Sequence, residues 1–461
     1  MSNTLIKGGD LLDCTGAETR KNTSLFVEGN RIARIGEPAE VKKFAEGKTY
    51  KTIDAGGRTV MPGLIDCHVH PSYGEVVSIE ELELYTPVEY RTLKAAHNIR
   101  KVLRAGVTSV CTPGGTFNIN VALRDAIASG LIEGPRVSAG SHYLTTHNAI
   151  GGGFFPSHIE HPVSSLAYLA NTKDEMVSYA RKAIKDGCDV VKISGDDTFG
   201  ISLAGSITLE EMRAVAEIAH LMDKKITIHA RSGRCTADAS RAGFDWLIHA
   251  SYMNEEELGV ILENRTPINP TFALLVNAVE WGPDLGLIQP LIDAFKQEIE
   301  AASKVLGRAY REGIMMMAGT DSGQLSVPSG EWHARELELH AELLGMSNMD
   351  AVLSGTRNAA FTLPFGDEVG TLEEGKLADV LVVAGDPLAD LSVLQDKSRL
   401  EVIMKDGEVV DTAVALEDPQ KYSWELPMVM WADPRLPDQH FVREHAKVKP
   451  AWMKKTSKAA E

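Results

Sequence analysis

The sequence has 461 residues, of which 44% are hydrophobic and 24% are charged, and its formal net charge at pH 7 is -17. This composition is ordinary for a folded protein of two or three domains. An acidic chain repels phosphate backbones, so we expect a small-molecule substrate and no nucleic-acid partner.

Membrane insertion and secretion are not expected either. No apolar run approaches the roughly 18 residues of a membrane span, and the start, MSNTLIKGGDLLDCTG, lacks the apolar core of a signal peptide. The five cysteines are scattered without a Cys-x-x-Cys pair, which argues against a disulfide framework and against a thiolate zinc site. We therefore expect a cytoplasmic protein with no membrane contact.

Both ends of the folded region carry short strand patterns. NTLIKGGDLLD and TSLFVEGNRIARIGE fall within 1–60, and ADVLVVAGDP and LEVIMKDGEVVD fall within 366–415. Neither set is long enough to be stable alone, so we predict one small β-sandwich domain built from both segments. Residues 416–461, rich in Pro and Trp and then basic, are predicted to be a C-terminal extension.

Between these segments, in residues 61–365, eight short apolar runs alternate with amphipathic helical patterns. Near-continuous apolar character is typical of parallel strands that are covered on both faces. The runs are GLIDCHVH, GVTSVCTPGG, PRVSAGSHYL, CDVVKISGDD, KITIHARSG, FDWLIHASY, TPINPTFALL and GIMMMAGTDSG. Eight β-then-α units predict an α/β fold, a (β/α)8 TIM barrel, which takes about 250 residues before insertions.

Catalytic groups of such a barrel stand at the carboxyl ends of its strands. His68 and His70 are two residues apart, so both imidazoles face the same side of the first strand. The groups at the other predicted strand ends are Lys192 on the fourth, His229 on the fifth, His249 on the sixth and Asp321 on the eighth.

Taken singly, each of these residues has an ordinary structural interpretation, such as a core histidine or a turn-forming aspartate. Their recurrence at one end of successive strands favours a metal site made of imidazole and carboxylate, the ligands of zinc and its first-row neighbours. Asp66 lies on the same face by parity and either orients a ligand or fills the barrel interior.

Lys192 is the distinctive member of this set. A buried ammonium beside a divalent cation is electrostatically unfavourable. Reaction of its amine with carbon dioxide would give a carbamate, an anion whose two oxygens can join two metals. The alternative is that Lys192 stays an amine and a single metal binds.

These motifs resemble the metal-dependent amidohydrolase superfamily over nearly the whole chain. PGLIDCHVH, DVVKIS, ITIHA, LIHAS and AGTDSG match its metal-binding strands, and GTLEEGKLADVLVVAGDP matches the return into its small β-domain. The layout is most similar to the imidazolonepropionase-like and prolidase-like branch, near the bacterial hydrolases of phenylurea and thiocarbamate herbicides.

The resemblance implies two divalent metals, zinc first with cobalt, manganese or iron as alternatives. It implies that His68, His70 and Asp321 hold one metal, that His229 and His249 hold the other, and that carboxylated Lys192 bridges them. A hydroxide between the metals would be the nucleophile, and Asp321 would pass its proton to the leaving nitrogen. The family also implies a homo-oligomer.

Several residues are weaker candidates. The long loop SHYLTTHNAIGGGFFPSHIEHP with Gly151–Gly153 is a candidate lid, and His142 or Tyr143 in it is a candidate hydrogen-bond donor to the oxyanion. By position alone, Tyr252 and Phe272 are predicted to be pocket walls. Trp332 and His333 either close the pocket or serve in packing.

One departure bears on the substrate. Dipeptidases of this branch follow the lysine strand with Ser-Gly-Gly, whereas ISGDD places Asp196 and Asp197 there. If these carboxylates face the mouth, they repel a substrate carboxylate, which favours a neutral amide, urea or carbamate; a solvated turn is the alternative.

The function expected is therefore metal-dependent hydrolysis of a C–N bond in an amide-like substrate. The rival interpretations are a prolidase-like dipeptidase or N-acyl amino acid hydrolase, a mononuclear deaminase, and a non-catalytic structural relative. Lys192 disfavours the deaminase and the complete ligand set disfavours the non-catalytic relative. The substrate, the metal and the oligomeric state are left open by the sequence.

Overall fold

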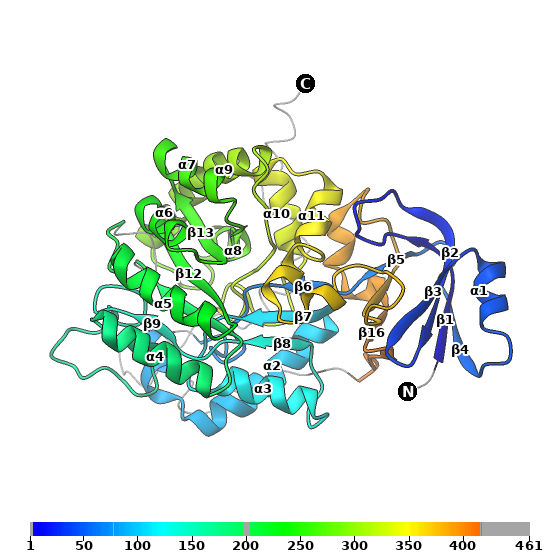
Figure 1. Cartoon of the computed structure of the whole chain (residues 1–461), viewed down its shortest axis with the longest axis horizontal. Helices are drawn as coiled ribbons and strands as arrows, with labels where there is room; N and C mark the ends of the chain where they lie inside the picture. Colours follow the sequence, from blue (N-terminus) through cyan, green and yellow to red (C-terminus); the bar gives the residue numbers. More distant parts are fainter. Residues whose placement is uncertain (1–2, 77, 197–202, 415, 417–461) are drawn as a thin grey trace.

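The computed structural model describes residues 3–76, 78–196, 203–414 and 416. Figure 1 shows a barrel of strands and helices on the left and a small sheet, blue and orange, beside it on the right. The chain starts in the small sheet, runs through the barrel, and returns to the small sheet.

The barrel is a TIM-barrel-type α/β fold with parallel strands. The three-stranded part has the order β6-β7-β8, and the six-stranded part has the order β10-β9-β11-β12-β13-β14. The strands are β6 (Leu64–Asp66), β7 (Val107–Thr112), β8 (Arg136–Ala139), β9 (Tyr143–Thr145), β10 (Ala167–Leu169), β11 (Val190–Ser194), β12 (Lys225–Ser232), β13 (Trp246–Tyr252) and β14 (Ile268–Asn269).

Three predicted barrel strands differ from expectation. The third divides into β8 and β9 around Gly140, where a Cβ would lie 2.0 Å from Pro113 O. The seventh is only Ile268–Asn269, because a helix begins at Phe272. The eighth pairs through isolated parallel bridges, Ile268 with Met316 and Val69 with Ser322, which connect β14 to the first strand segment and so close the barrel.

Helices cover the outside of the barrel. Three of them, α4, α5 and α7, begin with a capping box, in which side chain and backbone satisfy the free N–H groups of the first turn. The helices are α2 (Val88–Arg104), α3 (Ile119–Ala128), α4 (Lys173–Lys185), α5 (Leu209–Leu221), α6 (Gly233–Arg241), α7 (Glu255–Asn264), α8 (Phe272–Trp281), α9 (Gln289–Arg311), α10 (Arg335–Leu344) and α11 (Asn348–Ser354), with a π-helical turn η1 (Glu81–Tyr85).

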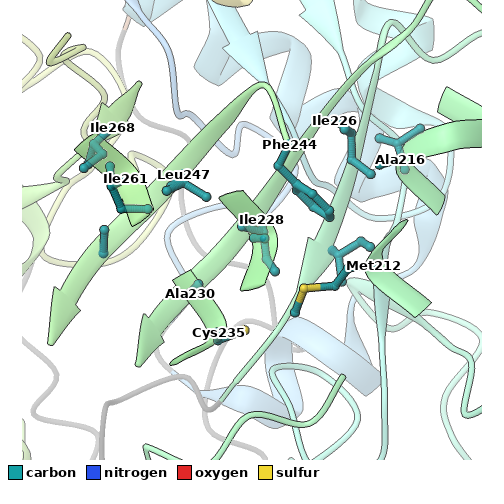
Figure 2. Close-up of a cluster of buried hydrophobic side chains, with 14 of the residues drawn as sticks. Met212, Ala216, Ile226, Ile228, Ala230, Cys235, Phe244, Leu247, Ile261 and Ile268 are labelled. Carbon is teal, nitrogen blue, oxygen red and sulfur yellow. The ribbon is translucent and has the colours of Figure 1, made fainter. Parts of the chain in front are cut away.

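The largest hydrophobic cluster lies between the strands and this helical layer. Ile226, Ile228 and Ala230 of β12 belong to it, as do side chains of α5 (Figure 2). Because side chains alternate along a strand, His229 and Arg231 point to the opposite face, the inside of the barrel. Packing of the outer side chains of β12 against the helices thus fixes which of its side chains point into the barrel.

The small sheet combines both ends of the folded chain. Its order is β17-β16-β15-β5-β1-β2-β3, with β4 also paired to β1. One hydrophobic cluster takes side chains from β1–β3 and from β15–β16, so the two halves of the sheet share a core. The elements are β1 (Asn3–Leu11), β2 (Arg20–Glu28), β3 (Arg31–Gly36), α1 (Pro38–Phe44), β4 (Tyr50–Asp54), β5 (Thr59–Pro62), β15 (Val380–Val383), β16 (Leu400–Lys405) and β17 (Glu408–Val409).

Four 3-10 helical turns connect the last barrel helices to the small sheet and link its final strands. They are η2 (Ala359–Thr362), η3 (Gly366–Glu368), η4 (Leu391–Leu394) and η5 (Lys397–Arg399). Of the predicted C-terminal extension, residues 417–461 lie outside the described residues. Among the helices in the described ranges, none has the length and apolar character that a bilayer crossing needs.

Candidate metal centre

Six predicted ligands converge inside the barrel mouth, and all six are buried. His68 Nε2 is the common neighbour: it lies 3.0 Å from His70 Nε2, 3.1 Å from Lys192 Nζ and 3.6 Å from Asp321 Oδ1. His70 Nε2 is 3.1 Å from Asp321 Oδ1. The ligand atoms of His68, His70 and Asp321 all lie within 4.8 Å of one another, as a shared metal requires.

A second pair of imidazoles lies beside this group. His249 Nε2 is 2.8 Å from His229 Nδ1, and the His68 and His249 ring centroids are 6.0 Å apart. Lys192, whose Nζ contacts His68, belongs to the strand next to that of His229. The structure thus brings together all six residues that the sequence predicted to bind metal.

The contacts of the other ring nitrogens show which nitrogens are left for the site. His70 Nδ1 lies 2.7 Å from Gly114 O, an atom that only accepts, so Nδ1 carries the proton and Nε2 presents a lone pair. Thr271 donates its hydroxyl hydrogen to Pro270 O at 2.6 Å, so its oxygen accepts from His249 Nδ1. The lone pair of His249 Nε2 then faces the ring nitrogen of His229.

Asp196 orients that last ring. Its Oδ1 lies 3.5 Å from His229 Nε2, and its carboxylate accepts hydrogen bonds from the backbone N–H of Arg231 and Ser232. With its proton on Nε2, toward this carboxylate, His229 would present a lone pair at Nδ1, 2.8 Å from that of His249. Two lone pairs at this separation repel unless a cation lies between them, so these residues fit a metal.

The expectations for Asp196 are therefore wrong. It is 1% exposed, so it is neither a solvated turn residue nor a charge facing the pocket mouth. Burial raises the pKa of Asp196 from 3.8 to about 6, against the hydrogen bonds that it accepts. Asp197 lies outside the described residues.

Two candidate ligands and Thr271, which contacts one of them, adopt left-handed backbone conformations that favour glycine. His249 has φ 74°, Asp321 has φ 59° and Thr271 has φ 60°. For the β-branched Thr271 this conformation is a true outlier. Strained backbone of this kind concentrates at functional sites, where surrounding contacts enforce it.

Asp66 ties the first and eighth strand segments together beneath the ligands. Its Oδ1 accepts hydrogen bonds from His68 N at 3.0 Å and Thr320 N at 3.1 Å. Its Oδ2 accepts from Thr320 Oγ1 at 2.6 Å and from His333 Nδ1 at 2.7 Å. The backbones that carry His68 and Asp321 are thereby held in register.

Burial controls the protonation states of the cluster. It lowers the pKa of His68, His70 and His249 below 6.5, so these imidazoles are neutral at pH 7 and able to bind metal. Burial also lowers the pKa of Lys192 from 10.5 to about 8. Although burial opposes it, the neighbouring His68, His70 and Lys192 lower the pKa of Asp321 below 3.8, so it is a carboxylate.

A cavity of about 340 Å³ opens onto the cluster and is walled mainly by apolar side chains. Tyr73, stacked on His70 with centroids 4.1 Å apart, and Tyr143, whose ring lies 5.5 Å from Lys192 Nζ, form its floor beside the ligands. The apolar wall consists of Val76, Ile79, Leu82, Ile150, Phe154, Leu166, Leu274, Ala278, Leu285, Leu287, Leu291, Phe295 and Leu325.

His142 is not brought to this cavity. Its Nε2 accepts a hydrogen bond from Phe117 N at 2.9 Å, and burial lowers its pKa to about 4. It lines a separate cavity of about 490 Å³ beside Tyr168 and Tyr179. A neutral ring whose Nε2 already accepts from the backbone is not placed to donate to an oxyanion, contrary to the prediction.

Tyr252 and Phe272 are also absent from the cavity wall, within the described residues. Phe272 begins α8 and is fully buried in the hydrophobic cluster outside the strands. Leu274 and Ala278 of the same helix line the cavity instead. Trp332 stacks on Trp281 at 4.7 Å, which is a packing role.

Residues 59–410 match the Amidohydrolase family. The chain belongs to the amidohydrolase family. Family membership and the enzymes it resembles make this amidohydrolase a hydrolase of amide-like C–N bonds, and enzymes of the family are typically metal-dependent. The His68, His70 and Asp321 group is its candidate metal site.

Its relatives agree with the branch inferred from the sequence. It is 25% identical to ochratoxinase of Aspergillus niger over 433 residues, 88% of this chain and 86% of that one. It is 22% identical to imidazolonepropionase of Haloarcula marismortui, with 88% and 93% of the two chains covered.

Solved structures show the same relationship. A Xaa-Pro dipeptidase with bound methionine in its active site has a TM-score of 0.78 and 27% identity, covering 89% of this chain and 100% of that one. Molinate hydrolase and phenylurea hydrolase B share the fold, with TM-scores of 0.74 and 0.71 at 21% and 19% identity. The alignment with molinate hydrolase covers 92% of this chain and 98% of that one, and the alignment with phenylurea hydrolase B covers 91% and 99%.

Sequence reasoning missed the residues of this amidohydrolase that support the ligands. The Thr271 hydroxyl contacts His249 and the Gly114 carbonyl contacts His70. Both contacts depend on backbone geometry, which no sequence motif predicts. Arg231 could have been predicted to face the barrel interior, because it is two residues beyond His229 on the same face of the strand.

Proposed function

We propose that this amidohydrolase holds two divalent ions. The opposed nitrogens of His229 and His249 carry this proposal, because they call for a cation separate from the one shared by His68, His70 and Asp321. Lys192 is the only one of the six whose own charge opposes a cation, and carboxylation of its amine removes that conflict.

The carbamate forms when the neutral amine of Lys192 attacks carbon dioxide and releases one proton. The lowered pKa of Lys192, about 8, makes the neutral amine accessible near physiological pH. The product is an anion with two oxygens in place of an ammonium, next to His68. Zinc is the first candidate metal for this donor set, with cobalt, manganese and iron as alternatives.

The ions would supply Lewis acidity, lowering the pKa of a water and polarising the substrate carbonyl. Asp321 is the residue placed to move the proton. It is a buried carboxylate whose Oδ1 lies 3.1 Å from His70 Nε2, and it accepts the proton of the attacking water and delivers it to the leaving nitrogen.

The cavity argues for a substrate with a bulky apolar part. A volume of about 340 Å³ accommodates a small organic molecule, and leucine, isoleucine, valine and phenylalanine dominate its wall. Burial of the apolar part of such a substrate contributes about 25 cal/mol of binding free energy per Å² of apolar surface removed from water.

A substrate screen with metal analysis on the same sample tests the proposal. Dipeptides, N-acyl amino acids, phenylureas and carbamates with large and small apolar groups are compared by kcat/KM. We expect hydrolysis of bulky apolar members by metal-loaded enzyme and loss of activity on chelation. Activity that survives chelation in a sample with only trace metal would refute it.

A further inference from the structure

One basic side chain stands in the apolar wall. Among the described residues that line the cavity, Arg231 is the charged side chain outside the metal cluster. It lies two residues beyond His229 on β12, about 7 Å farther along the strand toward the mouth. Parity places it on the same inner face as His229.

The guanidinium is held in place from behind. Arg231 Nη1 donates to Glu298 Oε1, and that oxygen also accepts from Ser251 Oγ at 2.6 Å. The side chains of Arg231 and Glu298 are 3% and 0% exposed. The ion pair therefore fixes the position of a cation that surface arginines would leave mobile.

Part of this guanidinium has no partner. Arg231 Nε is buried and makes no hydrogen bond within the described part of the chain. A buried donor without an acceptor is unfavourable, and a guanidinium edge is suited to a carboxylate. Arg231 lines the cavity, and among the described residues only Nη1 of its guanidinium has an acceptor, so the rest of the guanidinium is available to a carboxylate of the cavity's occupant.

Asp196, which would repel a substrate carboxylate if it faced the mouth, does not face it. Asp196 is turned toward His229 and the backbone of Arg231 and Ser232, with 1% of its surface exposed. Asp196 therefore gives no electrostatic argument for a neutral substrate.

We propose that Arg231 binds a carboxylate of the substrate, so that the preferred substrates are N-acyl amino acids or dipeptides with a bulky apolar group. This rests on the proposed amide hydrolysis. A carboxylate on the carbon attached to the scissile nitrogen lies beside the carbonyl under attack, and Arg231 is the next inward-facing residue after His229 on β12. Neutral ureas and carbamates lack this contact.

A matched ligand pair tests the assignment. N-acetyl-L-phenylalanine and N-acetylphenethylamine share the scissile amide and the phenyl group, and only the first has a carboxylate. Their dissociation constants for the metal-loaded enzyme are measured by calorimetry, and their hydrolysis is measured in the same samples. We expect the carboxylate ligand to bind at least about ten-fold more tightly.

Variants show whether Arg231 causes the preference. Arg231→Gln should abolish it, and Arg231→Lys should retain part of it. Because Arg231→Gln leaves Glu298 buried without its partner, the double variant Arg231→Gln/Glu298→Gln provides a neutral pair if the single variant does not fold. Arg234→Gln removes an exposed arginine, 82% accessible, and should keep the full preference.

Equal affinities for the two ligands in the wild type would overturn the inference. So would a preference that survives in the folded Arg231 variants, since the carboxylate would then be bound by the metals. Absence of hydrolysis with the preference intact and dependent on Arg231 would count against the proposed function and leave this assignment supported.

Discussion

Each of three imidazoles at the site turns one ring nitrogen toward a protein oxygen and the other toward the candidate metal centre. The Gly114 carbonyl accepts from His70 and the Thr271 hydroxyl accepts from His249, while the Asp196 carboxylate lies 3.5 Å from His229 Nε2. A fixed tautomer means that no proton has to move before a metal binds. We therefore expect these contacts to influence metal affinity.

Lys192→Ala tests the bridging role at the scale of one residue. We expect metal content to fall and activity to drop by at least about 100-fold, because the bridging anion is lost. A short carboxylic acid such as propionate should restore part of both. Metal content is measured by atomic emission, with Lys304→Ala, an exposed lysine on α9, as the control; a fully active, metal-replete Lys192→Ala enzyme would refute the bridge.

Thr271→Val tests the tautomer argument. Valine keeps the shape but accepts no hydrogen bond from His249 Nδ1, so we expect affinity for the second metal to fall about 10- to 100-fold. Thr271→Ser retains the hydroxyl and should behave as the wild type does. Zinc titration with a competing chelator gives the two affinities, and an unchanged second affinity in Thr271→Val would rule out this role.

At the scale of elements, two loops build much of the cavity wall. The segment after the first strand contributes Leu82, and the loop after β9 contributes Ile150, Phe154 and Leu166. Glu83 connects the two loops, because its backbone carbonyl accepts a hydrogen bond from Ser164 Oγ and its carboxylate accepts one from Leu166 N at 3.4 Å. A Cβ on the second glycine of the three, Gly152, would lie 1.9 Å from Thr146 O, so this loop conformation requires glycine.

Glu83 makes this junction sensitive to pH. Burial raises the pKa of Glu83 from 4.5 to about 7. A carboxyl whose pKa is raised on folding weakens the folded state as pH increases from 4.5 through 7, because only the unfolded chain releases the proton easily. The loss is at most about 3 kcal/mol, since one pKa unit corresponds to about 1.4 kcal/mol.

Glu83→Gln should therefore remove that loss and make the protein more stable than the wild type at pH 8. Glutamine retains an acceptor for Leu166 N. Thermal unfolding of both proteins from pH 5 to pH 8 measures the difference. A wild-type advantage at pH 8 would show that the ionised carboxylate stabilises the junction instead.

At the scale of the whole molecule, charged side chains join the barrel to the small sheet. Arg136 at the start of β8 pairs with Asp379 and Asp406, and the side chains of Arg136 and Asp379 are 14% and 4% exposed. β15 of the returning chain pairs with β5, which leads directly into the first barrel strand. The small sheet thus holds the strand that carries His68 and His70.

Arg136→Leu should destabilise the folded protein by about 3 kcal/mol, because it leaves Asp379 buried without its cation. We expect the midpoint of thermal unfolding to fall by a few degrees. Lys304→Ala, which breaks an exposed pair with Glu300, should change it by less than about one degree. Equal midpoints for Arg136→Leu and the wild type would contradict the link.

The barrel strands and the residues at their ends could be predicted from the sequence. The loop residues that surround the candidate metal centre could not. Strand parity and the barrel rule were enough to predict that all six candidate ligands, His249 included, meet at one end of the barrel. Loop residues were misplaced, because whether a side chain such as His142 turns toward the mouth depends on packing that one sequence does not specify. Thr271 escaped notice because its role depends on a left-handed backbone.

The central claim is a metal centre that catalyses amide hydrolysis, and the most direct test is a metal count joined to activity. Wild-type protein is analysed for metal, stripped with a chelator, and reconstituted with zinc in the presence of bicarbonate while an N-acyl amino acid is assayed. We predict about two ions per chain, loss of activity on stripping and its return on reconstitution. Full activity in protein with only trace metal would contradict the account.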